Sequence, residues 1–312
     1  MKTITLTKKQ FEKCSPYIID KDIVNSEAEF YIINKGKYKG KYLMKKLFIN
    51  EGKIFANKLL TISLLNDMEH ELGIEELCIP KHLISVDDEV IGFSIPKINN
   101  PRNLGLVLNN PKVDSLDKLR YLEEVGNILR KIQKQNVLDL SIGDLQPYNI
   151  LIDKNNKLHI IDLDSAYINT NYPIPSFYIS NKNTFVNLTD FGTKYNLVNF
   201  VEEEEKEGDK TSVVKIPTRL VRPDTNSDLL CYNFMIINTL ANYKINNLDV
   251  STYHDYITYL ETLGYGEDII NSFRNIYSNA DNVNPVDFFS DIPLDKVGLA
   301  RYKVYKKNMK NN

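Results

Sequence analysis

The sequence contains few of the residues from which disulfide frameworks, zinc sites and catalytic triads are built. Its 312 residues include three cysteines and four histidines, which lie far apart along the chain. Cys14, Cys78 and Cys231 show neither a disulfide spacing nor the Cys/His spacing of a zinc site, which is typical of a protein from a reducing cytosol. We do not expect a histidine-based triad or metal cluster, although spacing alone does not exclude one.

The chain also lacks a strong excess of one charge and lacks long apolar runs. The formal net charge is -2, so the composition provides no basic field for nucleic acid. No apolar run approaches the roughly 20 residues of a membrane-spanning helix, and the N-terminus carries no signal-peptide pattern. From these absences we expect a cytoplasmic protein with neither a nucleic-acid nor a membrane partner.

The most informative part of the chain is IGDLQPYN at residues 142–149, followed by IIDLD at residues 160–164. Asp144 is followed by Asn149 five residues later and by Asp162 thirteen residues after that. Magnesium prefers hard oxygen ligands and takes only one or two of them from the protein. Asn149 and Asp162 would supply that partial shell, which leaves Asp144 to accept a proton from an attacking hydroxyl.

The N-terminal part of the chain predicts a small antiparallel sheet with one main helix. Residues 28–48 contain two β-rich runs around a turn with two glycines, which predicts a hairpin. Apolar residues then recur at helical spacing from Glu51 to Leu72. Two further strands are predicted at His82–Val86 and Val90–Ile95, and we expect a hinge at residues 99–101.

The rest of the chain is predicted to be mostly helical. Ser115 is the expected N-cap of a helix with an apolar stripe, and Ser227 is the expected cap of a second one. Between them, strands are predicted at residues 150–152 and 158–161, joined by a turn. Further helices are expected at residues 252–264 and 267–278. Strands early and helices late predict an α+β fold in two lobes, residues 1–99 and residues 100–312.

These features together resemble the protein-kinase-like superfamily. Its catalytic loop reads H-x-D-x-x-x-x-N, and its D-F-G aspartate follows the Asn at the spacing that Asp144, Asn149 and Asp162 have here. Lys45 closes the hairpin where the family has V-A-I-K, and the segment around Asp228 is similar to the start of the central C-lobe helix. The G-D pair and the I-D-x-D-S phrase resemble atypical bacterial protein kinases. The G-D pair also resembles aminoglycoside and choline kinases.

The resemblance implies a bilobal kinase-like fold with ATP and Mg²⁺ as cofactors. It implies that Asp144 is the catalytic base and that Lys45 contacts the α- and β-phosphates. Asn149 and Asp162 would hold Mg²⁺ against the phosphates, so that Asn149 also contributes to nucleotide binding. Asp164 replaces the glycine of the family, and two interpretations stay open for it, a further metal ligand or a polar surface residue.

The segment that should cover the phosphates departs from the family pattern. Residues 24–31 contain no glycine, although glycine lets the backbone approach phosphate closely. Ser26 and Ala28 are small enough for a close approach and are our candidates for nucleotide contacts. Glu27 and Glu29 bring negative charge, so an alternating strand with acids that face solvent is an equal alternative.

Two further departures concern the charges around the site. The family places an acidic partner for the lysine on the following helix, but Glu51 comes too early and Glu69 too late. Either another residue steadies Lys45, or the ion pair is absent. Gln146 stands where many Ser/Thr kinases have a lysine, which removes a positive charge near the transferred phosphate.

An insertion is expected at about residues 180–215, and it contains the acidic run Glu202–Glu205. We expect this run to be a solvated loop, with a substrate-docking segment as the alternative. Residues 301–312 form a basic tail, expected to be a frayed end.

The leading functional hypothesis is an ATP- and Mg²⁺-dependent protein Ser/Thr kinase of atypical bacterial type. The alternatives are a small-molecule kinase on the same scaffold and an inactive pseudokinase that acts as a binding module. The phosphoryl acceptor and the oligomeric state stay open.

Overall fold

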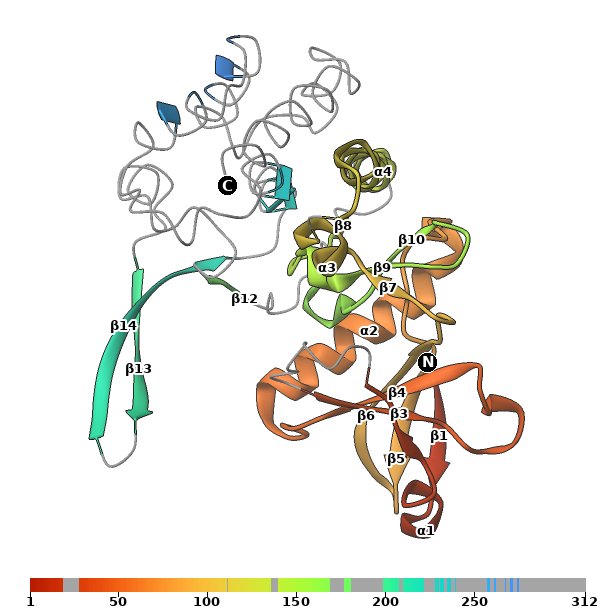
Figure 1. Cartoon of the computed structure of the whole chain (residues 1–312). Coiled ribbons are helices and arrows are strands. Elements are labelled where there is room, and N and C mark those ends of the chain that lie inside the picture. The colour runs from red at the N-terminus through yellow and green to blue at the C-terminus, as the bar shows by residue number, and fades with distance from the viewer. Residues whose placement is uncertain are drawn as a thin grey trace. The chain divides into compact units, whose positions relative to one another are not determined.

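The computed structural model describes residues 1–18, 28–110, 112–135, 140–168, 177–180, 199–207, 210–221 and isolated positions between 228 and 274. The chain is a mixture of helices and strands, and the largest sheet of its described part has six strands (Figure 1). It forms two compact units, residues 1–104 with 131–175 and residues 105–130 with 176–312. The expected division into lobes at residue 99 stays a prediction.

The first unit is built on a six-stranded sheet. Its first strand runs parallel to its neighbour, and the other neighbouring strands are antiparallel. The predicted hairpin and the predicted pair of strands after it are confirmed, whereas the two N-terminal strands were not predicted. In spatial order the strands are β1 (Lys2–Leu6), β5 (His82–Val86), β6 (Glu89–Pro96), β4 (Tyr42–Leu47), β3 (Ala28–Ile32) and β2 (Ser15–Pro16).

The connections in this part of the chain follow from residues that tolerate unusual backbone angles. Asp87 and Asp88 have φ angles of 46° and 70° in the tight turn between β5 and β6. Two consecutive positive φ angles match the right-handed twist of a hairpin, and aspartate adopts them more readily than most residues. The short helix α1 (Lys8–Phe11) begins at a capping box in which Thr7 accepts from the backbone of Gln10.

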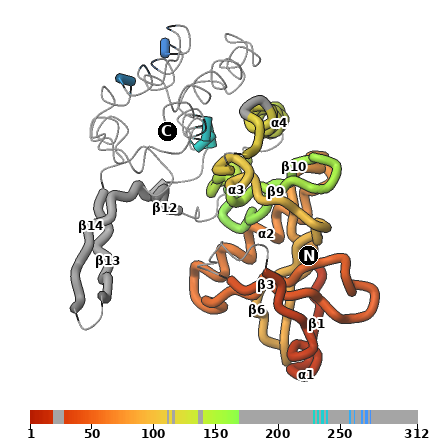
Figure 2. Tube along the Cα trace, in the orientation of Figure 1, coloured from red at the N-terminus to blue at the C-terminus, as the bar shows by residue number. Residues whose placement is uncertain are grey.

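The predicted helix is confirmed as α2 (Gly52–Leu72), which ends at Gly73 in the left-handed conformation. It packs on one face of the sheet through an apolar cluster, and a second cluster covers the other face; Figure 2 follows the chain through these elements. The cluster under α2 includes Leu43, Leu47, Phe55, Ile62 and Phe93. The cluster on the other face includes Ile4, Leu6, Met44, Ile84 and Ile91.

Short strands after residue 100 complete the first unit. The strands β9 (Ile150–Ile152) and β10 (Leu158–Ile160) form the predicted antiparallel hairpin, with β7 (Arg102–Asn103) on the outer edge of β9. A separate pair joins β8 (Leu140–Ser141) to β11 (Tyr167–Ile168). The motif residues therefore lie on loops between short paired strands.

The helix α4 (Ser115–Gln133) lies mostly in the second unit and confirms the predicted apolar stripe. Its first i→i+4 hydrogen bond runs from the Lys118 backbone N–H to the Asp114 carbonyl at 3.2 Å. Because the N-cap carbonyl accepts that first bond, the cap is Asp114, one residue before the expected Ser115. The short helix α3 (Leu104–Asn109) precedes it. The buried stripe of α4 is Leu119, Leu122, Val125, Ile128, Leu129 and Ile132.

The described residues from 228 to 239 and from 257 to 274 are helical, as predicted, while the expected cap Ser227 lies outside the described residues. The Tyr232 hydroxyl donates to the backbone carbonyl of Leu122 at 2.9 Å and ties this helix to α4. The basic tail at residues 301–312 also lies outside the described part of the chain.

The acidic run in the insertion is a strand, which corrects the expectation of a loop. It belongs to β13 (Asn199–Glu207), which pairs with β14 (Lys210–Val221), and β12 (Phe177–Ser180) pairs with the far end of β14. In this register Glu203 lies opposite Val214 and Glu204 opposite Val213. A β-branched partner strand can therefore pair the backbone of a sequence whose own composition favours solvent.

None of the helices in the described part of the chain is both long enough and apolar enough to span a membrane.

Candidate active site

Lys45 lies on the buried side of β4, where its charged end needs a partner. Side chains alternate along a strand, so Lys45 points to the same face as Leu43 and Leu47, beneath α2. Only 3% of Lys45 is exposed, and its ammonium lies 5.5 Å from the centre of the Phe93 ring. Its neighbour Lys46 faces the other way. A lysine on a solvated strand face would be exposed, so Lys45 is not such a residue.

The backbone of Lys45 is closely packed against the next strand. A Cβ atom placed on Gly92 of β6 would lie 2.0 Å from the Lys45 carbonyl oxygen. The register of β5 against β6 also shifts between Ile84 and Ser85, a bulge immediately beside this position. Only glycine allows the two backbones to approach so closely. This close packing fixes the position of the Lys45 backbone, from which the side chain extends.

Asp162 stands at the sharp turn that follows β10. Its φ and ψ angles are 64° and 45°, a left-handed conformation that is uncommon for residues other than glycine, asparagine and aspartate. The one-turn helix η3 (Leu163–Ser165) begins directly after it. The turn directs the carboxylates of Asp162 and Asp164 to the same ammonium group, that of Lys45.

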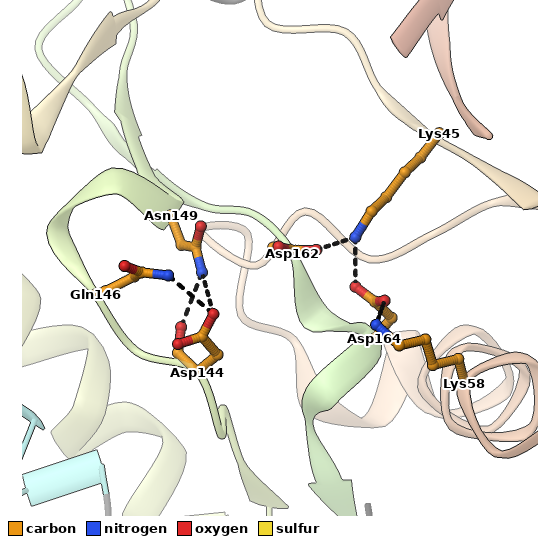
Figure 3. Close-up of polar contacts among 7 residues, drawn as sticks. All are labelled: Lys45, Lys58, Asp144, Gln146, Asn149, Asp162 and Asp164. Atoms are coloured by element: carbon orange, nitrogen blue, oxygen red, sulfur yellow. Dashed lines mark hydrogen bonds and ion pairs between the residues drawn. The ribbon is translucent and has the colours of Figure 1, made fainter. Parts of the chain in front are cut away.

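Four charged side chains form a compact cluster at this point, which we call the charge cluster: Lys45, Lys58, Asp162 and Asp164 (Figure 3). The Lys45 ammonium contacts Asp162 and lies 2.8 Å from Asp164 Oδ1. Lys58 of α2 reaches the other oxygen, Asp164 Oδ2, at 2.7 Å. The partners of Lys45, left open by the sequence, are thus the two aspartates, and α2 contributes a cation.

Lys58 was not predicted from the sequence, because an acid and not a cation was expected on this helix. Two signals were present. Asp164 adds a carboxylate shortly after the apolar strand β10, and a carboxylate needs a cation if it is buried. Lys58 lies three residues after Phe55, on the side of the helix that faces the sheet.

The charges in the cluster shift one another's pKa values. Burial alone would lower the pKa of Lys45, but Asp162 and Asp164 raise it above its ordinary value. Burial would raise the pKa of Asp164, but Lys45 and Lys58 hold it well below the usual range. Burial raises the pKa of Asp162, which Lys45 opposes and Asp164 reinforces. Asp164 is therefore the carboxylate that stays ionised, and Asp162 is the one with more to gain from an additional cation.

The loop with Asp144 begins at a glycine that the backbone requires. Gly143 has a φ angle of 82°, a left-handed backbone conformation that glycine adopts without strain. Gln146 donates its side-chain amide to Asp144 Oδ2 at 2.9 Å. Asn149, at the end of the one-turn helix η2 (Pro147–Asn149), donates to the same oxygen at 3.1 Å and to the Asp144 carbonyl at 2.9 Å. Two neutral amides thus hold the carboxylate of the predicted base.

Backbone hydrogen bonds connect this loop to the charge cluster. The Ile161 N–H, directly before Asp162, donates to the Asn149 carbonyl at 2.9 Å. On its other side Ile160 accepts from Cys78 at 2.9 Å and donates to Glu76 at 2.8 Å, in the segment that follows α2. The structure therefore brings together the predicted residues Asn149 and Asp162, as well as Lys45 with Asp162 and Asp164.

Asn149 and Asp162 fit the requirements of Mg²⁺, whereas Asp164 does not. The Asn149 amide nitrogen is bound to Asp144, so its oxygen is directed away from Asp144 (Figure 3). The Asp162 side chain is 33% exposed, while that of Asp164 is 1% exposed and has a lysine on each oxygen. Among the described residues no three His, Cys, Asp or Glu side chains form a metal site by themselves. A magnesium ion that keeps water and phosphate ligands does not need one.

The two remaining candidates are less informative. Ser26 lies outside the described residues. Ala28 begins β3, opposite Leu47, and is 3% exposed within the apolar cluster under α2. The Glu29 carboxylate accepts hydrogen bonds from the Lys46 ammonium at 3.1 Å and from the Tyr31 hydroxyl at 2.8 Å. The role of Ala28 at a phosphate stays a prediction.

Comparison with known proteins adds no further assignment. No protein-family model matches the chain, and no curated protein matches its sequence. The class of protein is therefore argued from the residues of the site alone.

Proposed function

We propose that the protein is an ATP- and Mg²⁺-dependent phosphotransferase of kinase-like bilobal fold. It transfers the γ-phosphoryl group to a hydroxyl, with Ser or Thr of a protein as the acceptor. One observation carries this proposal: the buried Lys45 contacts Asp162, which lies 117 residues later in the sequence. Motif spacing alone pairs these two residues as the phosphate-binding lysine and the metal-binding aspartate, and the contact supports that pairing.

The other residues have roles that follow from their contacts. Asn149 and Asp162 would hold Mg²⁺, which neutralises charge on the β- and γ-phosphates, and Lys45 adds a cation from the sheet. Asp144, held by Gln146 and Asn149, orients the acceptor hydroxyl and accepts its proton. Phosphoryl transfer depends mainly on such positioning, which rigid hydrogen-bonded side chains provide.

A phosphotransfer assay with a matched control tests this proposal. The purified chain is incubated with γ-labelled ATP and Mg²⁺, alone and with cell lysate, beside Asp162→Ala and Asp117→Ala. Asp117 is a suitable control because it is exposed at the start of α4 and its ion pair with Arg120, at 3.7 Å, lies on the surface. We expect labelled protein bands with the wild type and Asp117→Ala and none with Asp162→Ala.

The other outcomes separate the rival functions. Binding of nucleotide without label in any protein would contradict the protein acceptor and favour a small-molecule hydroxyl. Equal labelling with Asp162→Ala would refute the assigned metal residue. If the wild type binds no nucleotide, the phosphotransferase proposal fails and the chain is a binding module.

A further inference from the structure

Lys58 is the member of the charge cluster to which no motif assigns a role. It lies on α2 between Phe55 and Ile62, both of which pack against the sheet. Its side chain is 15% exposed, and its ammonium lies 2.7 Å from Asp164 Oδ2. The helix thus directs a cation to the point where the family resembled here has a helix acid.

Asp164 links this lysine to Lys45. Its Oδ1 accepts from Lys45 and its Oδ2 from Lys58, so the two ammonium groups hold the two ends of one carboxylate. The side chain of Asp164 is 1% exposed, so water does not compensate for a lost partner. A buried carboxylate that loses one of its cations is strongly destabilised and changes its position.

Asp162 differs from Asp164 in its access to solvent. Its side chain is 33% exposed, and its carboxylate contacts Lys45 from the more open side. A divalent cation held by Asp162 would compete with Lys45 for that carboxylate, whereas the buried Asp164 would keep its contact with Lys45. Asp162 is thus the exchangeable partner of Lys45 and Asp164 the fixed one.

We propose that Lys58 is a positioning residue: it fixes Asp164, and Asp164 keeps Lys45 directed into the site when Asp162 binds a metal. This inference rests on the proposed function. It assigns the positioning role on α2 to a lysine, whereas the family resembled here has an acid on this helix. It also assigns Asp164 to the orientation of Lys45 and not to the metal. Lys58 acts on the site through its contact with Asp164, and we assign it no contact with nucleotide or metal.

The first test measures the accessibility of Lys45 and requires no nucleotide. A small amine-acylating reagent is added to the intact chain, and labelling of the peptide with Lys45 is followed by mass spectrometry. We expect Lys58→Met to speed this labelling about tenfold, the effect of one lost charge-assisted hydrogen bond. Lys58→Arg, which keeps the charge, and Lys53→Met, on an exposed position of α2, should label at the wild-type rate.

The second test measures nucleotide kinetics on the same variants. Lys58→Met should raise KM for Mg·ATP about tenfold, and Lys58→Arg should restore it, whereas a merely structural lysine would change the melting temperature alone. If Lys58→Met does not fold, Lys58→Gln takes its place, because its amide is a shorter and weaker donor to Asp164.

The two tests separate the failure of this inference from the failure of the proposed function. Unchanged Lys45 labelling in Lys58→Met, with unchanged KM, overturns the role of Lys58 whatever the activity of the chain. Absence of nucleotide binding in the wild type overturns the proposed function and the role of Lys58 in it. Faster labelling in that case would still establish that Lys58 holds Lys45.

Discussion

Replacement of Gly92 by alanine should destabilise the first unit and disturb Lys45. The added Cβ would lie 2.0 Å from the Lys45 carbonyl oxygen and 3.2 Å from the Lys46 Cα. An ordinary contact is about 3.4 Å, so β4 and β6 must separate locally by about 1.4 Å. Hydrogen bonds between strands weaken steeply beyond about 3.2 Å, so this shift breaks the nearest ones.

The size of the effect follows from these contacts. Two lost ladder bonds at about 1 kcal/mol each, with about 1–3 kcal/mol of strain from overpacking, give a loss of about 3–5 kcal/mol. That loss corresponds to a fall in melting temperature of about 9–15 °C for a domain of this size. Thermal unfolding measures it. Gly40→Ala is the control, because its φ of 73° brings only left-handed strain, with no atom within 4 Å of the new Cβ. The reasoning is refuted if Gly92→Ala melts at the same temperature as Gly40→Ala or higher.

Three further predictions concern stability and reactivity. Lys131 lies 2.6 Å from Glu76 and holds the pKa of that buried carboxyl below its ordinary value of 4.5. The pair stabilises the fold above that pH and loses its effect as the pH falls. The melting temperature of Glu76→Gln, measured by differential scanning calorimetry, should therefore depend less on pH below 4.5 than that of the wild type. Cys14, Cys78 and Cys231 are all buried, and burial raises the pKa of Cys78 to about 12. A thiol reagent at neutral pH should therefore label these cysteines only after unfolding. Rapid labelling of the native protein would contradict their placement. Tyr232→Phe removes the buried hydroxyl that donates to the Leu122 carbonyl and should lower stability by about 1 kcal/mol in urea unfolding, where an unchanged midpoint would contradict the contact.

Local patterns in the sequence were sufficient to predict the hairpin, α2 and the strands β5, β6, β9 and β10. Each of these depends on a periodicity or turn signal within a few residues. The strand β1 was missed because its stability comes from its pairing with β5, in which Lys2 lies opposite His82. The strand β13 was missed for a related reason, because its acidic sequence is paired by a β-branched strand later in the chain.

The candidate site shows the same limit. Spacing within one motif predicted Asp144, Asn149 and Asp162 as a group, and hydrogen bonds between their loops join them. The role of Asp164 could not be decided from the sequence, because it depends on the burial of its carboxylate and on a lysine 106 residues earlier. Neither the burial of this carboxylate nor its contact with that lysine can be predicted from the residues next to Asp164.

The most direct test of the central claim is a calorimetric titration of Mg·ATP into the wild type, Lys45→Met and Lys46→Met. The two lysines are neighbours on β4, but Lys45 faces α2 and the aspartates, while Lys46 pairs with Glu29 on the other face. We predict binding to the wild type and to Lys46→Met with similar affinity, and at least about tenfold weaker binding to Lys45→Met. The account is contradicted if the wild type binds no Mg·ATP, or if Lys45→Met binds it as tightly as Lys46→Met.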